Sequence, residues 1–204
     1  MDEVIIINIL EEAKRIIDIE ALALKDLSIQ IGDEFAKVIE VIANVEGKVV
    51  VVGVGKSGHI GQKIAATLSS TGTPSFFMHA AEGLHGDLGM IEKKDIVILI
   101  SNSGETSELV SLLPSLNQIK PVKIALTSNK YSTLAKAANY SLIYQYDKEA
   151  DYLNVAPTTS STLTLAIGDA LAGTVAKLKA FDKENFHLYH PGGSLGKQLE
   201  KRYK

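Results

Sequence analysis

The stretch that decides the fold is Asp95-Ile96-Val97-Ile98-Leu99-Ile100, followed by the hexapeptide Ser101-Asn102-Ser103-Gly104-Glu105-Thr106. The first six residues are almost wholly apolar, which is typical of a buried parallel strand. From Ser107 to Leu113 the apolar residues recur at helical spacing. The hexapeptide is therefore predicted to lie where a strand turns into a helix, beside backbone N–H groups that have no partner within that helix.

The same hexapeptide predicts a phosphate-binding turn. A helix start offers free N–H groups and partial positive charge, and Gly104 allows a ligand to approach the backbone. The hydroxyls of Ser101, Ser103 and Thr106 add further donors. Such residues also occur as ordinary helix caps, but one or two hydroxyls suffice for a cap. Three hydroxyls around one glycine favour phosphate binding.

The composition sets limits on the class of protein. The chain has 204 residues, 46% hydrophobic and 6% aromatic, with a formal net charge of −3 and no Cys. We expect a single domain over residues 1–204, in which residues 1–44 form an N-terminal helical segment. The balance of charge favours neither nucleic acid nor membrane as a partner. Without Cys there is no disulfide or thiolate metal site, which fits a cytoplasmic location.

The N-terminal segment carries packing patterns and no chemical motif. Residues 3–44 predict two helices that separate at Gly32, with apolar stripes from Ile5 to Ile17 and from Phe35 to Ile42. The acidic start does not resemble a signal peptide. We expect this helical arm to serve in packing or in contacts between subunits.

Five short apolar runs, alternating with helical patterns, predict an α/β fold with a doubly wound parallel sheet of five strands flanked by helices. The runs are residues 48–52, 74–78, 95–100, 122–127 and 140–144. Ligands of such sheets bind beyond the carboxyl ends of the strands. Lys56, His85 and the serine-rich turn all follow strand ends, so we expect them at one shared site.

The first strand runs into Gly53-Val54-Gly55-Lys56-Ser57-Gly58, which matches the dinucleotide fingerprint G-x-G-x-x-G. The acidic residue expected at the end of the second strand is missing, so a dinucleotide oxidoreductase is a weak alternative. A P-loop would need Gly at position 50, where the chain has Val. We interpret Gly55, Lys56 and Ser57 as an anion- or hydroxyl-binding turn.

Three later segments supply candidate acid–base groups. His85 lies in the glycine-rich stretch 82–89. It is interpreted as a substrate contact or as a general acid or base; half of a metal site is the least favoured alternative. Glu149 is either an exposed charge or a catalytic base. It precedes a run of five hydroxyl residues, 158–162, in which Thr158 and Ser160 are candidates for substrate binding. The sequence after His190, Pro-Gly-Gly-Ser, suits a loop that places an imidazole accurately.

Taken in order, five segments resemble the motifs of arabinose-5-phosphate isomerases of the sugar isomerase (SIS) domain superfamily, over roughly residues 30–200. They are Gly53-Val54-Gly55-Lys56-Ser57-Gly58-His59, Leu84-His85-Gly86-Asp87-Leu88-Gly89, Ser101–Thr106, Ala156-Pro157-Thr158-Thr159-Ser160 and His190-Pro191-Gly192-Gly193-Ser194-Leu195-Gly196. The resemblance implies a flavodoxin-like or Rossmann-like SIS domain that interconverts D-ribulose 5-phosphate and D-arabinose 5-phosphate, and so supplies Kdo for lipopolysaccharide and some capsules.

The resemblance also implies residue roles. The implied active-site residues are Lys56, His85, Glu108, Glu149 and His190, and the implied phosphate ligands are Ser101, Asn102, Ser103 and Thr106. It implies a homotetramer with sites shared between subunits. Longer members carry a pair of regulatory CBS domains after the isomerase domain, and this sequence lacks them, which leaves its regulation open.

The expected reaction needs neither metal nor cofactor and passes through a cis-enediol(ate). Glu149 is the favoured proton-transfer base, with a pKa raised by partial burial; His190 and Glu108 are the rivals. Lys56 would stabilise negative charge on oxygen, and His85 and Glu108 would move hydroxyl protons. The alternatives are another SIS isomerase, such as one acting on 6-phospho-3-hexulose, or a non-catalytic sensor of sugar phosphates or nucleotide sugars.

Overall fold

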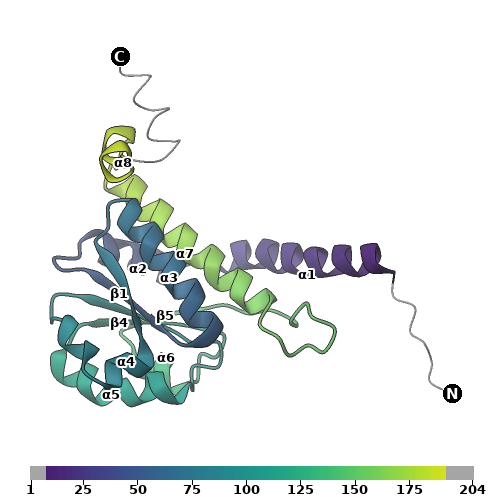
Figure 1. The fold of residues 1–204 in the computed structure, drawn as a ribbon, viewed down its shortest axis with the longest axis horizontal. Helices are drawn as coiled ribbons and strands as arrows, with labels where there is room; N and C mark the ends of the chain where they lie inside the picture. The colour runs from purple at the N-terminus through teal and green to yellow at the C-terminus, as the bar shows by residue number, and fades with distance from the viewer. Residues whose placement is uncertain (1–7, 192–204) are drawn as a thin grey trace.

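A five-stranded, all-parallel sheet forms the centre of the protein, with helices on both faces (Figure 1). The computed structural model describes residues 8–191. The strand order is β2-β1-β3-β4-β5. The strands are β1 (Val49–Gly53), β2 (Ser75–His79), β3 (Ile96–Ile100), β4 (Val122–Thr127) and β5 (Tyr140–Ile143). The expected doubly wound sheet is confirmed, with the strand order of flavodoxin-like folds.

The helices divide into two layers. The helices α1 (Ile9–Gln30), α2 (Asp33–Ala43), α3 (Gly55–Ser70) and α7 (Thr159–Leu178) contribute to one face, and α4 (Ala80–Leu84), α5 (Ser107–Ile119) and α6 (Thr133–Ala137) contribute to the other. The short helices η1 (Asp87–Met90) and α8 (Lys183–Tyr189) complete the described chain. Within the described residues, none of the helices combines the length and apolar character that a membrane crossing demands.

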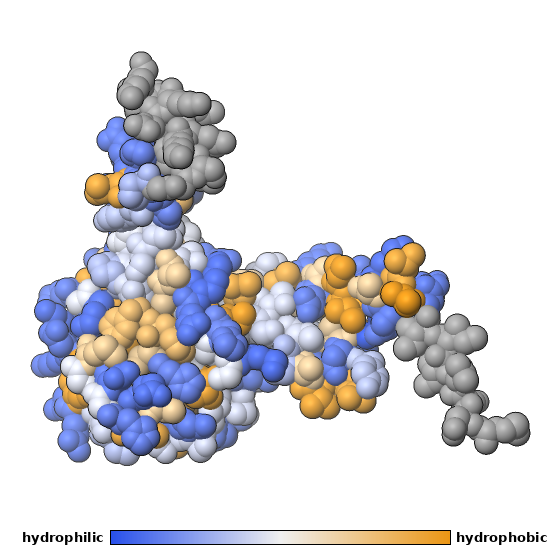
Figure 2. All heavy atoms as spheres, viewed as in Figure 1, coloured by the Kyte–Doolittle hydropathy of each residue, from blue (hydrophilic) through white to orange (hydrophobic). Residues whose placement is uncertain are grey.

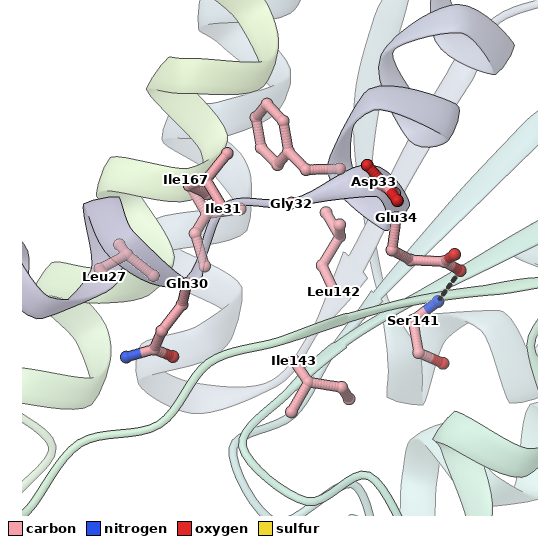
Figure 3. Close-up of a pocket in the computed structure, with 11 residues that line it drawn as sticks. Leu27, Gln30, Ile31, Gly32, Asp33, Glu34, Ser141, Leu142, Ile143 and Ile167 are labelled. Atoms are coloured by element: carbon pink, nitrogen blue, oxygen red, sulfur yellow. Dashed lines mark hydrogen bonds between the residues drawn. The ribbon is translucent and has the colours of Figure 1, made fainter.

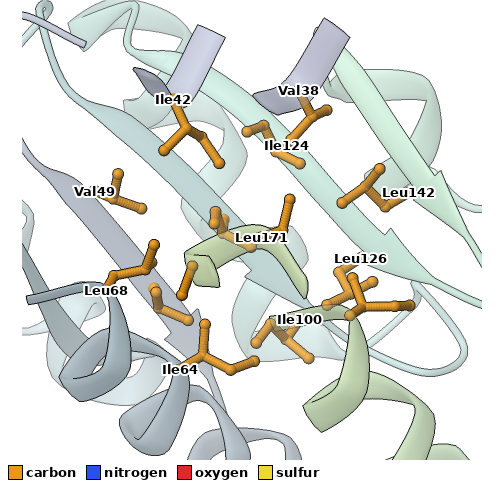
Figure 4. Packing of buried hydrophobic residues seen from close by; sticks show 14 of the residues in the cluster. Val38, Ile42, Val49, Ile64, Leu68, Ile100, Ile124, Leu126, Leu142 and Leu171 are labelled. Atoms are coloured by element: carbon orange, nitrogen blue, oxygen red, sulfur yellow. The ribbon is translucent and has the colours of Figure 1, made fainter. Parts of the chain in front are cut away.

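The core follows from the alternation of side chains along each strand. In β3, Ile96, Ile98 and Ile100 face the layer of α2, α3 and α7, whereas Val97 and Leu99 face α5. Figure 4 shows the first of these two clusters, in which Leu171 of α7 lies over the sheet beside Ile100 and Leu126. Burial on both faces explains why the strand sequences are apolar without interruption.

The N-terminal helices are confirmed, with the break between them at Ile31 and Gly32. The side chain of Asn8 caps the start of α1 by accepting a hydrogen bond from the Glu11 N–H group. Only the end of α1 packs on the core, through Ala23 and Leu27. The rest projects from the molecule, so several of its large apolar side chains are exposed (Figures 1 and 2). Ile5, the first residue of the expected stripe, lies outside the described residues.

A buried carboxylate fixes the amino-terminal end of β3. Asp95 is 0% exposed and accepts hydrogen bonds from Lys48 Nζ at 2.8 Å, from the Lys48 N–H at 3.0 Å and from the Glu92 N–H at 2.7 Å. Burial alone raises the pKa of Asp95, but these bonds outweigh it, so the pKa lies below the ordinary value of 3.8. The ionised carboxylate therefore stabilises the fold.

We predict that Asp95→Asn lowers the free energy of unfolding at pH 7 by about 2 kcal/mol, because an amide cannot accept all three hydrogen bonds and leaves Lys48 without its charge partner. A group with a lowered pKa in the folded state stabilises above its unfolded pKa and loses this effect as the pH falls. The difference between wild type and variant should therefore shrink in acid. Urea unfolding from pH 7 to pH 3 measures it.

Glu92→Gln is the matched control, because Glu92 is 59% exposed and its carboxylate is 3.7 Å from Lys48 Nζ. Its cost should stay below about 0.5 kcal/mol. Equal losses in the two variants would contradict the special role of Asp95.

Candidate active site

Two helix starts meet at the carboxyl edge of the sheet. The neighbouring strands β1 and β3 are followed directly by α3 and α5, which pack on opposite faces. Their N-cap residues, Val54 and Thr106, make no side-chain capping bond to the helix. Helix starts of this kind present free N–H groups and partial positive charge to an anion. The crevice between these two strands is the place where doubly wound sheets bind ligands.

The serine-rich turn has one internal hydroxyl and two outer ones. Ser101 is 2% exposed; its Oγ accepts the Gly104 N–H at 3.0 Å and shares a hydrogen bond of 2.7 Å with Thr106 Oγ1. Ser103 is exposed, and its Oγ accepts the Glu105 N–H at 3.2 Å. Ser101 therefore orders the turn from inside, while Ser103 and the half-buried Thr106 lie nearer to solvent.

Residues at the end of β4 hold this turn from behind. The Asn102 carbonyl accepts hydrogen bonds from Thr127 Oγ1 at 3.0 Å and from the Ser128 N–H at 3.0 Å. Gly104 has φ +68°, and a Cβ there would collide with the side chain of Ser132. Only glycine fits both the left-handed backbone and the small space. The turn is thus a rigid scaffold, as a phosphate cradle requires.

The side chain of Asn102 is engaged at both ends. Its Nδ2 donates to the Tyr146 hydroxyl at 2.9 Å, and its Oδ1 accepts from the Tyr144 hydroxyl at 3.0 Å. These contacts point the amide toward the segment after β5. The expectation that Asn102 binds phosphate stays a prediction, and the contacts favour a contribution from its backbone.

Glu149 is a buried carboxylate, 8% exposed. Its Oε1 accepts from the Tyr146 hydroxyl at 3.0 Å, and its Oε2 accepts the Thr158 N–H at 2.8 Å and the Ser160 N–H at 3.1 Å. Glu149 thus caps the start of α7 from nine residues upstream. The alternative of an exposed charge is therefore wrong.

The expected pKa of Glu149 was also wrong in direction. Burial raises the pKa, but hydrogen bonds from Ser160, Thr158 and Tyr146 outweigh burial and hold the pKa below the ordinary value of 4.5. Negative charge is further favoured by the N-terminus of α7. The carboxylate is consequently ionised at neutral pH and able to accept a proton.

Two hollows flank Asn102. One, of about 50 Å³, is lined by Lys56 and Ser57 of α3 together with Asn102 and Ser160, among others. The other, of about 490 Å³, is polar and is lined by Asn102, Tyr146 and Glu149, among others. Lys56 and Gly55 are exposed at the start of α3, where Gly55 has φ +55°. The structure therefore brings the glycine turn, the serine turn and Glu149 together at one edge.

The hydroxyl of Thr158 has partners within the fold: it accepts the Ala150 N–H at 2.8 Å and contacts Glu149 Oε2 at 3.2 Å. Ser160 is 3% exposed and lies at the small hollow. Both residues thus support the Glu149 segment, and their binding of substrate stays a prediction.

His85 and Glu108 lie on the other side of the edge. His85 is exposed at the end of α4, which packs against α5, and Glu108 lies in the first turn of α5. Hydrogen bonds from its own N–H and from Ser107, with the nearby His79, lower the pKa of Glu108. These two candidates belong to the layer that carries the serine-rich turn.

His190 is the one candidate that the described chain does not bring to this edge. It follows α8, at the far end of α7 from Thr158 (Figure 1). A helix of 20 residues is about 30 Å long. The imidazole stacks on Phe186 at 3.9 Å, and its Nδ1 donates to the Phe186 carbonyl at 2.8 Å, which leaves the lone pair of a neutral ring on Nε2. The remainder of the His190 motif, residues 192–196, lies outside the described residues.

A further pocket lies away from this edge. It has a volume of about 290 Å³ between the α1–α2 connection and β5, and Asp33 and Glu34 are the charged residues in its lining (Figure 3). Two carboxylates without a basic residue do not suit a phosphate ester. Across residues 8–191, no three His, Asp or Glu side chains gather as a metal site would need.

Sequence reasoning missed the residues that support the turn. Thr127 ends β4 and Ser128 follows it, at the sheet edge where Ser101 follows β3, and this common position could have indicated them. Tyr144 and Tyr146 come just after β5 and are two residues apart, a spacing that places both side chains on one face of an extended chain. His79, opposite Gly53 at the end of β2, was also missed; its charge lowers the pKa of the candidate Glu108.

Comparison with known proteins shows the family to which this chain belongs. The SIS domain model matches residues 42–173. The chain belongs to the SIS domain family. This SIS chain is 50% identical, over 95% of its length, to the Pseudomonas aeruginosa protein named arabinose 5-phosphate isomerase KdsD, and 51% identical, over 88%, to the Escherichia coli O6:H1 protein named arabinose 5-phosphate isomerase KpsF. It spans 59% and 55% of the lengths of these relatives.

Among solved structures, the SIS domain resembles that of an E. coli CFT073 protein in complex with arabinose 5-phosphate. The two share a TM-score of 0.88 and 44% sequence identity, with coverage of 94% of this chain and 100% of the other. The resemblance to the isomerase family is thereby confirmed.

We predict that Gly104→Ala lowers the free energy of unfolding of this SIS domain by about 1–3 kcal/mol, because Ala strains the left-handed backbone and its Cβ displaces Ser132. Gly173→Ala is the matched control: it lies within α7 with open space around it, and should stabilise by about 0.5–1 kcal/mol. Thermal and urea unfolding of both variants test this. A neutral Gly104→Ala would show that the turn adapts.

Proposed function

We propose that this protein is an aldose–ketose isomerase that interconverts D-ribulose 5-phosphate and D-arabinose 5-phosphate. One observation carries the proposal: a phosphate-type turn, a lysine and an ionised, buried carboxylate converge on Asn102 at one edge of the sheet. The relatives named arabinose 5-phosphate isomerase support the choice of substrate.

In the proposed complex the phosphate lies at the start of α5, on the turn Ser101–Thr106. Free N–H groups, the helix dipole and the hydroxyls of Ser103 and Thr106 would hold it there. Binding of this remote end restricts the position of C1 and C2 at the other end of the sugar. The binding energy gained at the phosphate thus orients the reacting carbons.

The chemical step transfers one proton between neighbouring carbons. A base removes the proton from C1 of ribulose 5-phosphate, and the electron pair of that bond forms the C1–C2 double bond of a cis-enediolate as the C2 carbonyl oxygen becomes negative. The base then returns the proton to C2, while the hydroxyl proton on O1 moves to O2, so that C1 becomes the aldehyde.

Glu149 remains our proposed base, because it is ionised and lines the larger hollow. Lys56 would stabilise the negative oxygen of the enediolate, and His85 and Glu108 would move protons between the hydroxyls. No metal or cofactor enters this proposed mechanism.

His190 fits the mechanism only if it acts in a neighbouring subunit. It lies beyond the far end of α7 from its own Glu149 segment, and a helix of 20 residues is about 30 Å long. The exposed apolar side chains of α1 offer a surface for a second copy: Ile9, Leu10, Ile17, Leu22 and Ile29 are 60–78% exposed (Figure 2). We therefore propose a homotetramer with sites shared between subunits.

The wider role is also a proposal. The names of the relatives favour production of arabinose 5-phosphate. We propose that this product supplies Kdo for lipopolysaccharide or capsule synthesis in the cytoplasm. Residues 1–204 would act as one SIS domain with an N-terminal helical segment. A net charge of −3 fits a small-molecule substrate and neither nucleic acid nor membrane.

Incubation of the pure protein with ribulose 5-phosphate and EDTA should yield arabinose 5-phosphate, identified by chromatography against standards. In D₂O the product should carry deuterium at C2, and Glu149→Gln should abolish this incorporation while the variant still binds arabinose 5-phosphate in calorimetry. Conversion of 6-phospho-3-hexulose alone, or tight binding without turnover, would sink the proposal in favour of the other isomerase or of a sensor.

Shared sites predict complementation between inactive variants. Lys56→Ala and His190→Ala should each be nearly inactive, but unfolding and refolding them together should restore part of the activity, because some hybrid sites combine an intact Lys56 with an intact His190. The variants refolded separately are the controls. No recovery in hybrids whose formation is verified by mass spectrometry would place both residues in one chain.

A further inference from the structure

The hydroxyl of Tyr146 lies between two groups that belong to opposite ends of the site. It accepts a hydrogen bond from Asn102 Nδ2 at 2.9 Å and donates one to Glu149 Oε1 at 3.0 Å. Asn102 belongs to the phosphate-type turn after β3, whereas Glu149 caps α7. One phenol thus connects the turn to the carboxylate.

The charge of Glu149 fixes the direction of every bond in this network. An ionised carboxylate can only accept, so the Tyr146 hydroxyl must donate to it and must accept from the amide nitrogen of Asn102. The Asn102 Oδ1 then faces the Tyr144 hydroxyl, which donates at 3.0 Å. Burial raises the pKa of Tyr144 to about 12 and also raises the pKa of Tyr146, so both phenols keep their protons at neutral pH.

The two tyrosine rings are held as a pair. Their centroids are 6.2 Å apart with an angle of 25° between the planes, and Tyr144 is 1% exposed. Because the Tyr146 ring stacks on the fully buried Tyr144 ring, its movement is restricted. The Tyr146 hydroxyl is therefore a fixed point for both Asn102 and Glu149.

We propose that Tyr146 is a positioning residue of the reaction, which holds the Glu149 carboxylate at a set place relative to the phosphate-binding turn through the Asn102 amide. This inference rests on the proposed function and deepens it. Because the phosphate would be held by the turn and the proton taken by Glu149, the network sets the distance between the two ends of the bound sugar phosphate. The role is distinct from catalysis, since Tyr146 acts through Glu149.

Other charged groups surround this network and stay unchanged in the test. Asp147 and Lys148 are exposed on the same segment, Asp26 of α1 lines a neighbouring hollow, and Lys56 of α3 lies across Asn102. Arg15 of α1 donates to the Ala150 carbonyl at 2.7 Å. These groups are the same in the wild type and in Tyr146→Phe. A difference in kcat or in the pH profile between the two proteins is therefore due to the loss of the Tyr146 hydroxyl.

Tyr146→Phe keeps the stacked ring and removes only the hydroxyl. We expect about a tenfold fall in kcat with KM for ribulose 5-phosphate within about twofold of wild type, as the loss of one hydrogen bond to a charged group implies. That bond stabilises the ionised form of Glu149, so its loss must raise the pKa of Glu149. The acidic limb of the pH profile of kcat should therefore move to higher pH.

Tyr144→Phe is the matched variant, because Tyr144 also contacts Asn102 but makes no hydrogen bond to Glu149 among the described residues. It should leave the acidic limb in place, because it removes a partner of Asn102 and none of Glu149. Tyr131→Phe, whose side chain is exposed, should match wild type in all three quantities.

Two outcomes overturn the inference. One is an acidic limb that stays in place in a folded Tyr146→Phe variant. The other is a Tyr144→Phe variant whose acidic limb moves as far as that of Tyr146→Phe, which would mean that the shift does not report the hydrogen bond from Tyr146 to Glu149. A wild-type protein that fails to isomerise ribulose 5-phosphate would instead refute the proposed function, and circular dichroism with thermal unfolding of each variant separates both results from misfolding.

Discussion

The parallel pairing of β1 with β3 is the constraint on which the candidate site depends. Parallel strands end at the same edge, and the chain then leaves β1 and β3 toward opposite faces as α3 and α5. Two helix starts whose N-cap side chains make no capping bond are thereby brought side by side. The helix starts and Lys56 supply the positive charge at the crevice, so a chain with a net charge of −3 can still offer an anion site.

A third helix start, that of α7, is treated differently. Its N–H groups are occupied by Glu149, whose carboxylate is buried by the same arrangement. The bonds that hold this carboxylate also keep it ionised, which opposes the usual effect of burial. A carboxylate held in this way is accurately placed and ionised at neutral pH, but it binds a proton more weakly than one whose pKa is raised. Under the proposed function, accurate placement would have to compensate for this lower basicity.

The polar residues behind the serine-rich turn give the site its rigidity. The Asn102 carbonyl accepts a hydrogen bond from the end of β4, and the Asn102 side-chain amide forms hydrogen bonds with the two tyrosines after β5. The turn is thus fixed by neighbours from strands that follow it in the sequence. Local sequence cannot show such contacts, because residues 102 and 146 meet only when β3, β4 and β5 lie in order in the sheet.

By itself, the amino-acid sequence determined the five strands, the break at Gly32 and the turn at Gly104, because periodicity, glycine and capping residues act over a few neighbours. It also placed Lys56, His85 and the serine-rich turn at one edge, since parallel strands allow no other arrangement. Only the tertiary structure decided the state of Glu149, the separation of His190 from the remaining candidates and the exposure of α1. These depend on which distant groups donate to a carboxylate and on which way a helix of 20 residues points, and neither follows from local pattern.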